Sequence, residues 1–166
     1  MTPLSLIRIN ARAPYKVFID IHDDFKFTTD IDINYRISFD EDRALGGCDT
    51  YQFVIEKLDH RRSPHDPKVE GTILAILDEF FASYQDVLIY FCDTSDGREA
   101  MRNRLFLTWF ERNAAPNRFT IRTAHAVVEG QGFYAAVIVE NRNPRLADVI
   151  ADFEQTAAAL TEGKPQ

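Results

Sequence analysis

Hydrophobic positions along this chain recur first with the period of a strand. In residues 31–39 every second side chain is apolar and the intervening ones are polar. This period of two predicts a strand with one wet face, which is typical of antiparallel sheets. Residues 15–21 and 51–58 have a similar character and are predicted strands. Residues 40–50 are polar and hold two adjacent glycines, so they are predicted to form a loop.

A helical period follows from residue 65 onward. Asp66 and Pro67 are typical of an N-cap and a first helical position, and apolar side chains then recur at helical spacing as far as Tyr84. Residues 87–91 are apolar on both faces, which predicts a central, buried strand. A strand, a helix and a strand in this succession predict a parallel crossover unit.

The second half of the chain adds two helices and a hairpin. A helix is predicted over about residues 96–113, strands over 119–128 and 133–140, and a last helix from Asn143-Pro144 to about Leu160. The expected fold class is α+β, with a single-layer mixed sheet of about six strands packed against three helices. The predicted order is strand, strand, strand, helix, strand, helix, strand, strand, helix.

The length of 166 residues and the lack of an internal linker predict one domain over residues 1–166, with an ordered core at about 14–160. The apolar share of 45% and the charged share of 27% are those of a globular chain. The side chains that we expect in the core are Phe80, Phe81, Leu88, Tyr90, Leu105, Trp109, Val137 and Phe153.

The net charge and the sequence motifs limit the classes of partner and cofactor that we expect. A net charge of −7 makes nucleic acid an unlikely partner, and no apolar run approaches the roughly 20 residues of a membrane span. The N-terminal residues lack the pattern of a secretory signal, so we expect a cytoplasmic protein. Cys48 and Cys92 fit no metal or redox spacing, and the glycines form no phosphate-binding motif, so neither a metal nor a cofactor is predicted.

The segment 90–110 carries the strongest candidate chemistry. On a helical wheel Arg98 and Arg102 fall on the apolar face of their own predicted helix. A guanidinium on such a face requires an anion or several carbonyl groups as partners. Asp93 and Asp96 lie just upstream and are the obvious internal partners. The favoured interpretation is therefore a structural ion-pair cluster between the end of a strand and the start of a helix.

A ligand site is the alternative interpretation of the same segment. Ligands of open α/β sheets bind beyond the carboxyl ends of strands, where helix N-termini offer amide donors. Arg98 and Arg102 would hold a phosphate or carboxylate there, and Gly97 would let the ligand approach the backbone. The candidate ligand-binding residues are Asp93, Asp96, Gly97, Arg98 and Arg102, and no catalytic residue is predicted.

Two motifs in this half of the chain resemble those of a known family. They are TI-x-x-IL-x-x-FF from Thr72 and CD-x-x-D-x-R-x-x-x-R-x-RLF-x-x-WF from Cys92. The chain thereby resembles a family of small bacterial proteins classed as a domain of unknown function, over about Tyr51 to Phe153. The resemblance implies a bacterial, cytosolic protein and supplies no active site.

Uneven charge supports the function that we expect. Residues 20–59 hold 11 acidic and 4 basic side chains, whereas residues 98–122 hold 6 arginines and 2 acids. We expect a non-catalytic binding or regulatory module that acts through protein contacts, with a protein partner or a second copy of the chain. The alternative is an enzyme or sensor for a small anionic ligand at Asp93–Arg102. Activity as an enzyme is the less favoured of the two.

Overall fold

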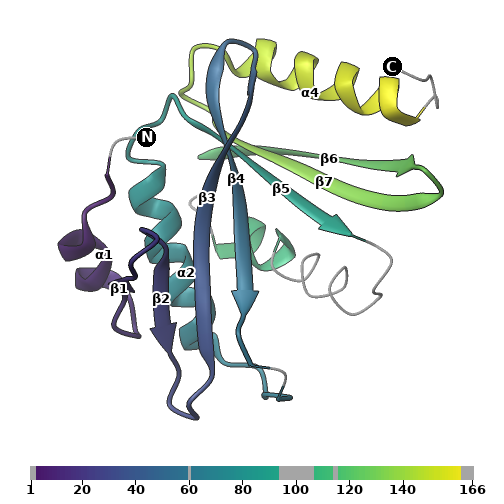
Figure 1. The fold of residues 1–166 in the computed structure, drawn as a ribbon. Coiled ribbons are helices and arrows are strands. Elements are labelled where there is room, and N and C mark those ends of the chain that lie inside the picture. Colours follow the sequence, from purple (N-terminus) through teal and green to yellow (C-terminus); the bar gives the residue numbers. More distant parts are fainter. Residues whose placement is uncertain (1–2, 60, 94–106, 114–115, 162–166) are drawn as a thin grey trace. The chain divides into compact units, whose positions relative to one another are not determined.

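The computed structural model describes residues 3–59, 61–93, 107–113 and 116–161 of the chain. They form an α+β fold whose strands make a mixed sheet in the order β1-β2-β3-β4-β5-β7-β6 (Figure 1). Residues 107–113 add a helical segment. Within the described residues there are thus seven strands and four helices, against about six and three predicted from the sequence. The elements are α1 (Leu6–Arg12), β1 (Phe18–Ile19), β2 (Phe25–Thr28), β3 (Asn34–Leu45), β4 (Cys48–Lys57), α2 (Pro67–Phe80), β5 (Val87–Asp93), β6 (Phe119–Val128), β7 (Gln131–Glu140) and α4 (Leu146–Thr161).

The chain divides into two compact units. Unit 1 comprises residues 1–40 and 53–83, and unit 2 comprises residues 41–52 and 84–166. The strands β3 and β4 each contribute residues to both units. The single-domain organisation of the chain stays a prediction.

In unit 1 the predicted helix start at Asp66 is confirmed. The Asp66 side chain accepts a hydrogen bond from the backbone of Lys68 at 2.9 Å, and Pro67 begins α2. The helix α1, which the hydrophobic pattern does not predict, lies beside α2 (Figure 1). Its Arg8 donates to both carboxylate oxygens of Glu79 on α2, with the closest contact at 2.8 Å. The short helix α1 thus buries Ile9 and forms an ion pair with α2 through the exposed Arg8.

Aromatic rings fill the interior of unit 1. The ring of Phe39 stacks on Phe80 with centroids 4.9 Å apart, and Phe80 meets Phe81 edge-on at the same distance. On the neighbouring strands Phe27 stacks on Tyr35 at 5.2 Å. Rings bury a large apolar area and pack in these offset or edge-on geometries. The stacked rings of Phe39 and Phe80 therefore join this part of the sheet to α2.

Residues 40–50 form a hairpin and not the predicted loop. The strand β3 continues through Leu45, β4 begins at Cys48, and Gly46 and Gly47 adopt φ of 58° and 80°. Positive φ at both central residues is typical of a two-residue hairpin turn. Residues 41–44 are exposed, so their polar character reflects contact with water and hides their strand conformation from the sequence pattern.

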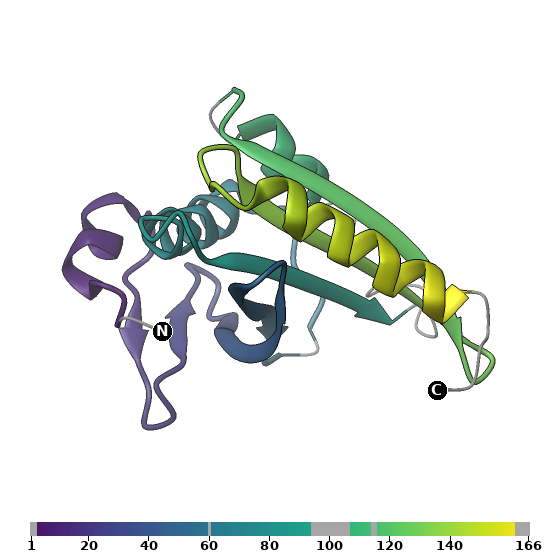
Figure 2. The same ribbon diagram turned by 90° about the horizontal axis from the view of Figure 1, so that it is seen from above.

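In unit 2 the helix α4 covers one face of the strands β6 and β7 (Figure 2). The strand β5 pairs in parallel with β4 and antiparallel with β7, so the predicted crossover through α2 and the central position of β5 are confirmed. The core beneath α4 is aliphatic in the main. It consists of Leu45, Cys48, Val87, Ile89, Val137, Val139, Val149 and Phe153.

The expected core is confirmed at six of its eight positions. Leu105 lies outside the described residues. Trp109 is only half-buried, so its predicted place in the core is wrong. The helical segment 107–113 buries Leu107 and Phe110 instead, and Phe110 packs on Phe119 with centroids 5.1 Å apart. The buried face of this segment is therefore rotated from the one that the sequence pattern predicts.

Candidate functional site: an apolar groove in unit 2

The site predicted at residues 93–102 lies almost wholly outside the described residues. The backbone of Asp93 ends β5 and pairs with Phe133 of β7. Asp96, Gly97, Arg98 and Arg102 are not described. The ion-pair cluster and the anion site therefore both stay predictions.

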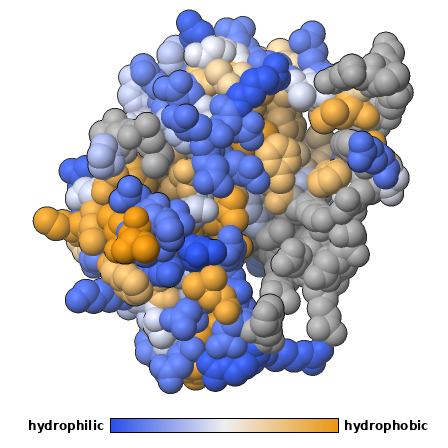
Figure 3. All heavy atoms as spheres, viewed as in Figure 1, coloured by the Kyte–Doolittle hydropathy of each residue, from blue (hydrophilic) through white to orange (hydrophobic). Residues whose placement is uncertain are grey.

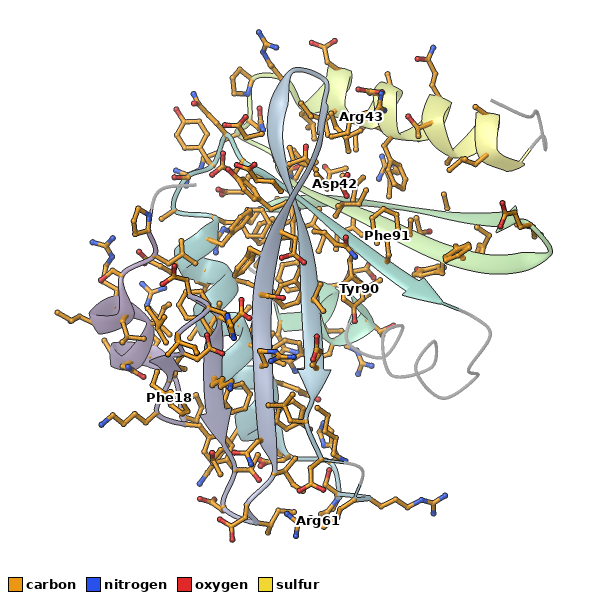
Figure 4. All side chains as sticks on the ribbon, viewed as in Figure 1. Phe18, Asp42, Arg43, Arg61, Tyr90 and Phe91 are labelled. Carbon is orange, nitrogen blue, oxygen red and sulfur yellow. The ribbon has the colours of Figure 1, made fainter. Side chains whose placement is uncertain are left out.

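The described residues of unit 2 contain a groove of about 500 Å³ between α4 and the sheet. Figure 4 shows two of its side chains, Arg43 from the hairpin beside α4 and Phe91 on β5. Phe91 is 40% exposed, so the groove is open to water. The wall from α4 is Phe153, Thr156, Ala157 and Leu160, the floor is Ile89, Phe91, Ala124, Phe133 and Ala135, and the hairpin supplies Asp42, Arg43, Leu45 and Gln52.

Strand register explains the shape of the floor. Phe91 of β5 pairs with Ala135 of β7, and Ala135 pairs with Ala124 of β6. Paired residues point to the same face of a sheet, so one phenyl ring and two methyl groups lie in a row across three strands. The side-chain layer on this face of the sheet is therefore shallower at the two alanines than at Phe91.

The helix α4 also carries a small side chain above this row. Four helical residues rise about 6 Å, nearly the length of two strand residues, so successive turns of α4 pass successive inward side chains of β7. Val149 and Phe153 fill the layer over Val137. One turn later the helix presents Ala157 to the groove. Small side chains on both layers leave the space between them unfilled.

A hydrogen-bond network fixes the hairpin to α4 at the rim. Arg43 donates through Nη2 to Asp152 Oδ1 at 3.1 Å and to Thr156 Oγ1 at 2.8 Å. The backbone N–H of Gly46 donates to Asp152 Oδ2 at 2.9 Å. The Gly46 N–H, and then the Arg43 charge, hold the pKa of Asp152 below its usual value although partial burial opposes this. Asp152 therefore stays ionised and anchors the wall.

Asp42 is the second carboxylate at the groove. Its Oδ1 accepts only the backbone N–H of Arg43, at 2.7 Å, among the described hydrogen bonds. Within the described part of the chain no Lys, Arg or His side chain lies within ion-pair distance of Asp42. This carboxylate therefore contributes an unbalanced negative charge to the rim.

A separate acidic group involves the neighbouring Glu41. Burial raises the pKa of Tyr51, and the charges of Asp86, Asp49 and Glu41 raise it further. Burial and the charge of Asp49 likewise raise the pKa of Asp86. Glu41 thus acts on Tyr51 and does not line the groove, whereas the adjacent Asp42 does.

The groove could not be recognised in the sequence because its lining is mostly apolar. The signal that it carries is the placement of alanine at inward positions of three elements, Ala124, Ala135 and Ala157. A search for catalytic or metal-binding side chains cannot detect a site that is formed by small apolar side chains. The strand pairing that aligns Ala124 with Ala135 follows from the hairpin turn at residues 129–130.

Two further properties concern the described residues alone. No three His, Cys, Asp or Glu side chains among them are grouped so as to hold a metal ion. No helix in the described ranges is both long and apolar enough to cross a membrane.

Comparisons with known proteins place the chain in a family. No curated protein and no solved structure matches it. A family model described as a family of unknown function, DUF6169, matches residues 65–155, more than half of the chain. The match confirms the resemblance to a family of unknown function, although it begins after Tyr51, where the similarity was expected to start. The chain therefore belongs to the DUF6169 family.

Proposed function

We propose that this protein is a non-catalytic binding module and that the groove of unit 2 holds a small hydrophobic ligand. The observation that carries the proposal is an open groove of about 500 Å³ whose floor and helical wall are apolar. Ligand pockets of proteins have volumes of about 300–1,000 Å³ and are lined mainly by apolar side chains with a few polar groups. Here the polar groups lie at the hairpin side and at Thr156.

A titration with octan-1-ol, followed by amide shifts in NMR spectra, tests this function. We expect the largest shifts at Ala124, Ala135 and Ala157, which line the groove. Ala157→Phe places a phenyl ring in the groove and is expected to weaken binding at least tenfold. Ala158→Phe is the matched control because Ala158 is exposed on the same helix. Equal binding by both variants, or shifts confined to other residues, would contradict the proposal.

A surface of unit 1 favours a second candidate function, docking of a protein partner or a second copy of the chain. Ile7 is 85% exposed and Ile21 is 92% exposed, and Phe18 and Ile19 are about half exposed. Hydrophobic side chains gather over α1 and β1 (Figure 3), and β1 is the terminal strand in the sheet order. Exposed apolar patches and sheet edges are typical of protein interfaces.

Native mass spectrometry of the intact protein tests this second function. We expect a dimer or a retained protein subunit that Ile7→Ser weakens, because Ile7 lies on α1 and the substitution removes exposed apolar surface without touching the core. Ile31→Ser is the control, since Ile31 is half exposed but lies outside α1 and β1. A monomer at all concentrations, for the unaltered chain, would argue against docking through this surface.

A further inference from the structure

We infer that the groove of unit 2 selects a small hydrophobic organic cation, with Asp42 as the partner of its positive charge. This inference rests on the proposed function, since it names the class of ligand that the same groove takes.

The charges at the rim favour a cation. Three ionised side chains are found there, Asp42, Arg43 and Asp152, and their sum is one negative charge. Arg43 is already held by Asp152, whereas Asp42 has no cationic partner within the described residues. A cation at Asp42 would balance the rim. An anion would have to approach Arg43 beside two carboxylates.

The hydrogen bonds of Arg43 leave an alternative, in which the groove binds an anionic ligand. Both of its side-chain hydrogen bonds use Nη2, so Nε and Nη1 keep donors without a partner among the described residues. A carboxylate ligand would find these donors. The rim nevertheless keeps its negative sum, because the Gly46 N–H holds Asp152 in its ionised form. Whether the groove prefers a cationic or an anionic ligand therefore decides whether Asp42 or Arg43 binds the charge of the ligand.

The aromatic floor gives a second reason for a cation. Phe91 and Phe133 both line the groove, and Phe91 is accessible to a ligand. The face of an aromatic ring attracts an ammonium group, most of all where water is excluded. The hydrocarbon part of the same ligand would lie over Ala124 and Ala135, where the floor is low.

Three probes with the same tail separate these alternatives. Octyltrimethylammonium, octan-1-ol and octanoate are titrated by calorimetry at low ionic strength, below the concentrations at which they form micelles. We expect the ammonium probe to bind about tenfold more tightly than the alcohol, from one exposed charge pair and one ring contact. Octanoate is expected to bind most weakly, and added salt to reduce the preference for the ammonium probe.

Two isosteric variants assign the preference to a residue. Asp42→Asn should remove most of the preference for octyltrimethylammonium, leaving only the part due to the ring contact, and should leave the affinity for the alcohol unchanged. Glu41→Gln removes the same charge from the adjacent residue, which does not line the groove, and should keep most of the preference. Tightest binding of octanoate, or a preference that Asp42→Asn leaves undiminished, overturns the inference. Failure of octan-1-ol to bind in the groove overturns the proposed function itself.

Discussion

In each of the two units a helix packs on strands, but different kinds of side chain fill the layer between the helix and the strands. Unit 1 packs ring on ring, with Phe80 of α2 stacked on Phe39. Unit 2 packs Val149 and Phe153 on aliphatic strand residues and then opens at Ala157. Side-chain size along one helix therefore decides where such a layer is solid and where it holds a groove.

The largest loss of stability is expected when one aromatic ring is removed from unit 1. Phe80→Ala is expected to lower the free energy of unfolding by about 3–5 kcal/mol, because a fully buried ring leaves a cavity among fixed aromatic neighbours. Urea denaturation measures the change. Phe153→Ala in unit 2 is the comparison and should cost less, about 3 kcal/mol, because Phe153 borders an open groove. A Phe153→Ala cost equal to or larger than that of Phe80→Ala would remove the distinction between the layers.

An intermediate effect is expected at the hairpin turn that meets α4. Gly46 has φ of 58°, and a Cβ there would lie 2.5 Å from the backbone nitrogen of Val149. Gly46→Ala should therefore lower stability by about 2–3 kcal/mol through strain and a backbone clash, measured by thermal unfolding. Gly130→Ala is the control, since Gly130 shares a positive φ but no atom lies within 4 Å of its added Cβ. It should cost only about 1 kcal/mol.

The smallest expected effect concerns the rim of the groove and depends on pH. Asp152→Asn should cost about 1 kcal/mol at pH 7, because it weakens charge-assisted bonds from Gly46 and Arg43 that are partly exposed to water. The pKa of Asp152 is lowered on folding, so its contribution is present above the unfolded value of about 3.9 and is lost as the pH falls through the folded value. Urea curves of both proteins at several pH values should converge below about pH 4. A difference that stays constant into acid would show that the charge of Asp152 is not what stabilises the rim.

Local sequence signals, such as hydrophobic periodicity and capping residues, predicted several of the elements. The cap at Asp66, the buried strand β5 and the hairpin of β6 and β7 all followed from local signals. The hairpin arm at residues 41–44 was missed because its side chains are exposed, and α1 was missed because it is a seven-residue helix with one buried side chain, Ile9. Such exposed or short segments carry no clear periodic signal.

The groove could not be predicted because it depends on long-range alignment. Alanine at positions 124, 135 and 157 has no meaning until strand register and helix position bring these residues together. The residues that the sequence singled out, from Asp93 to Arg102, were chosen for their charge. Local chemistry identifies charged candidates readily, whereas an apolar site is defined by missing volume.

The bond between Arg43 and Thr156 joins residues that are 113 positions apart. At ribosomal rates of about 5–20 residues per second, the wall from α4 is synthesised about 6–20 s after the hairpin that it meets. During most of this interval the floor of the groove is itself incomplete, because its strands β6 and β7 come directly before α4 in the sequence. The ligand site is therefore a late product of synthesis, and only a chain that has released α4 from the ribosome can bind there.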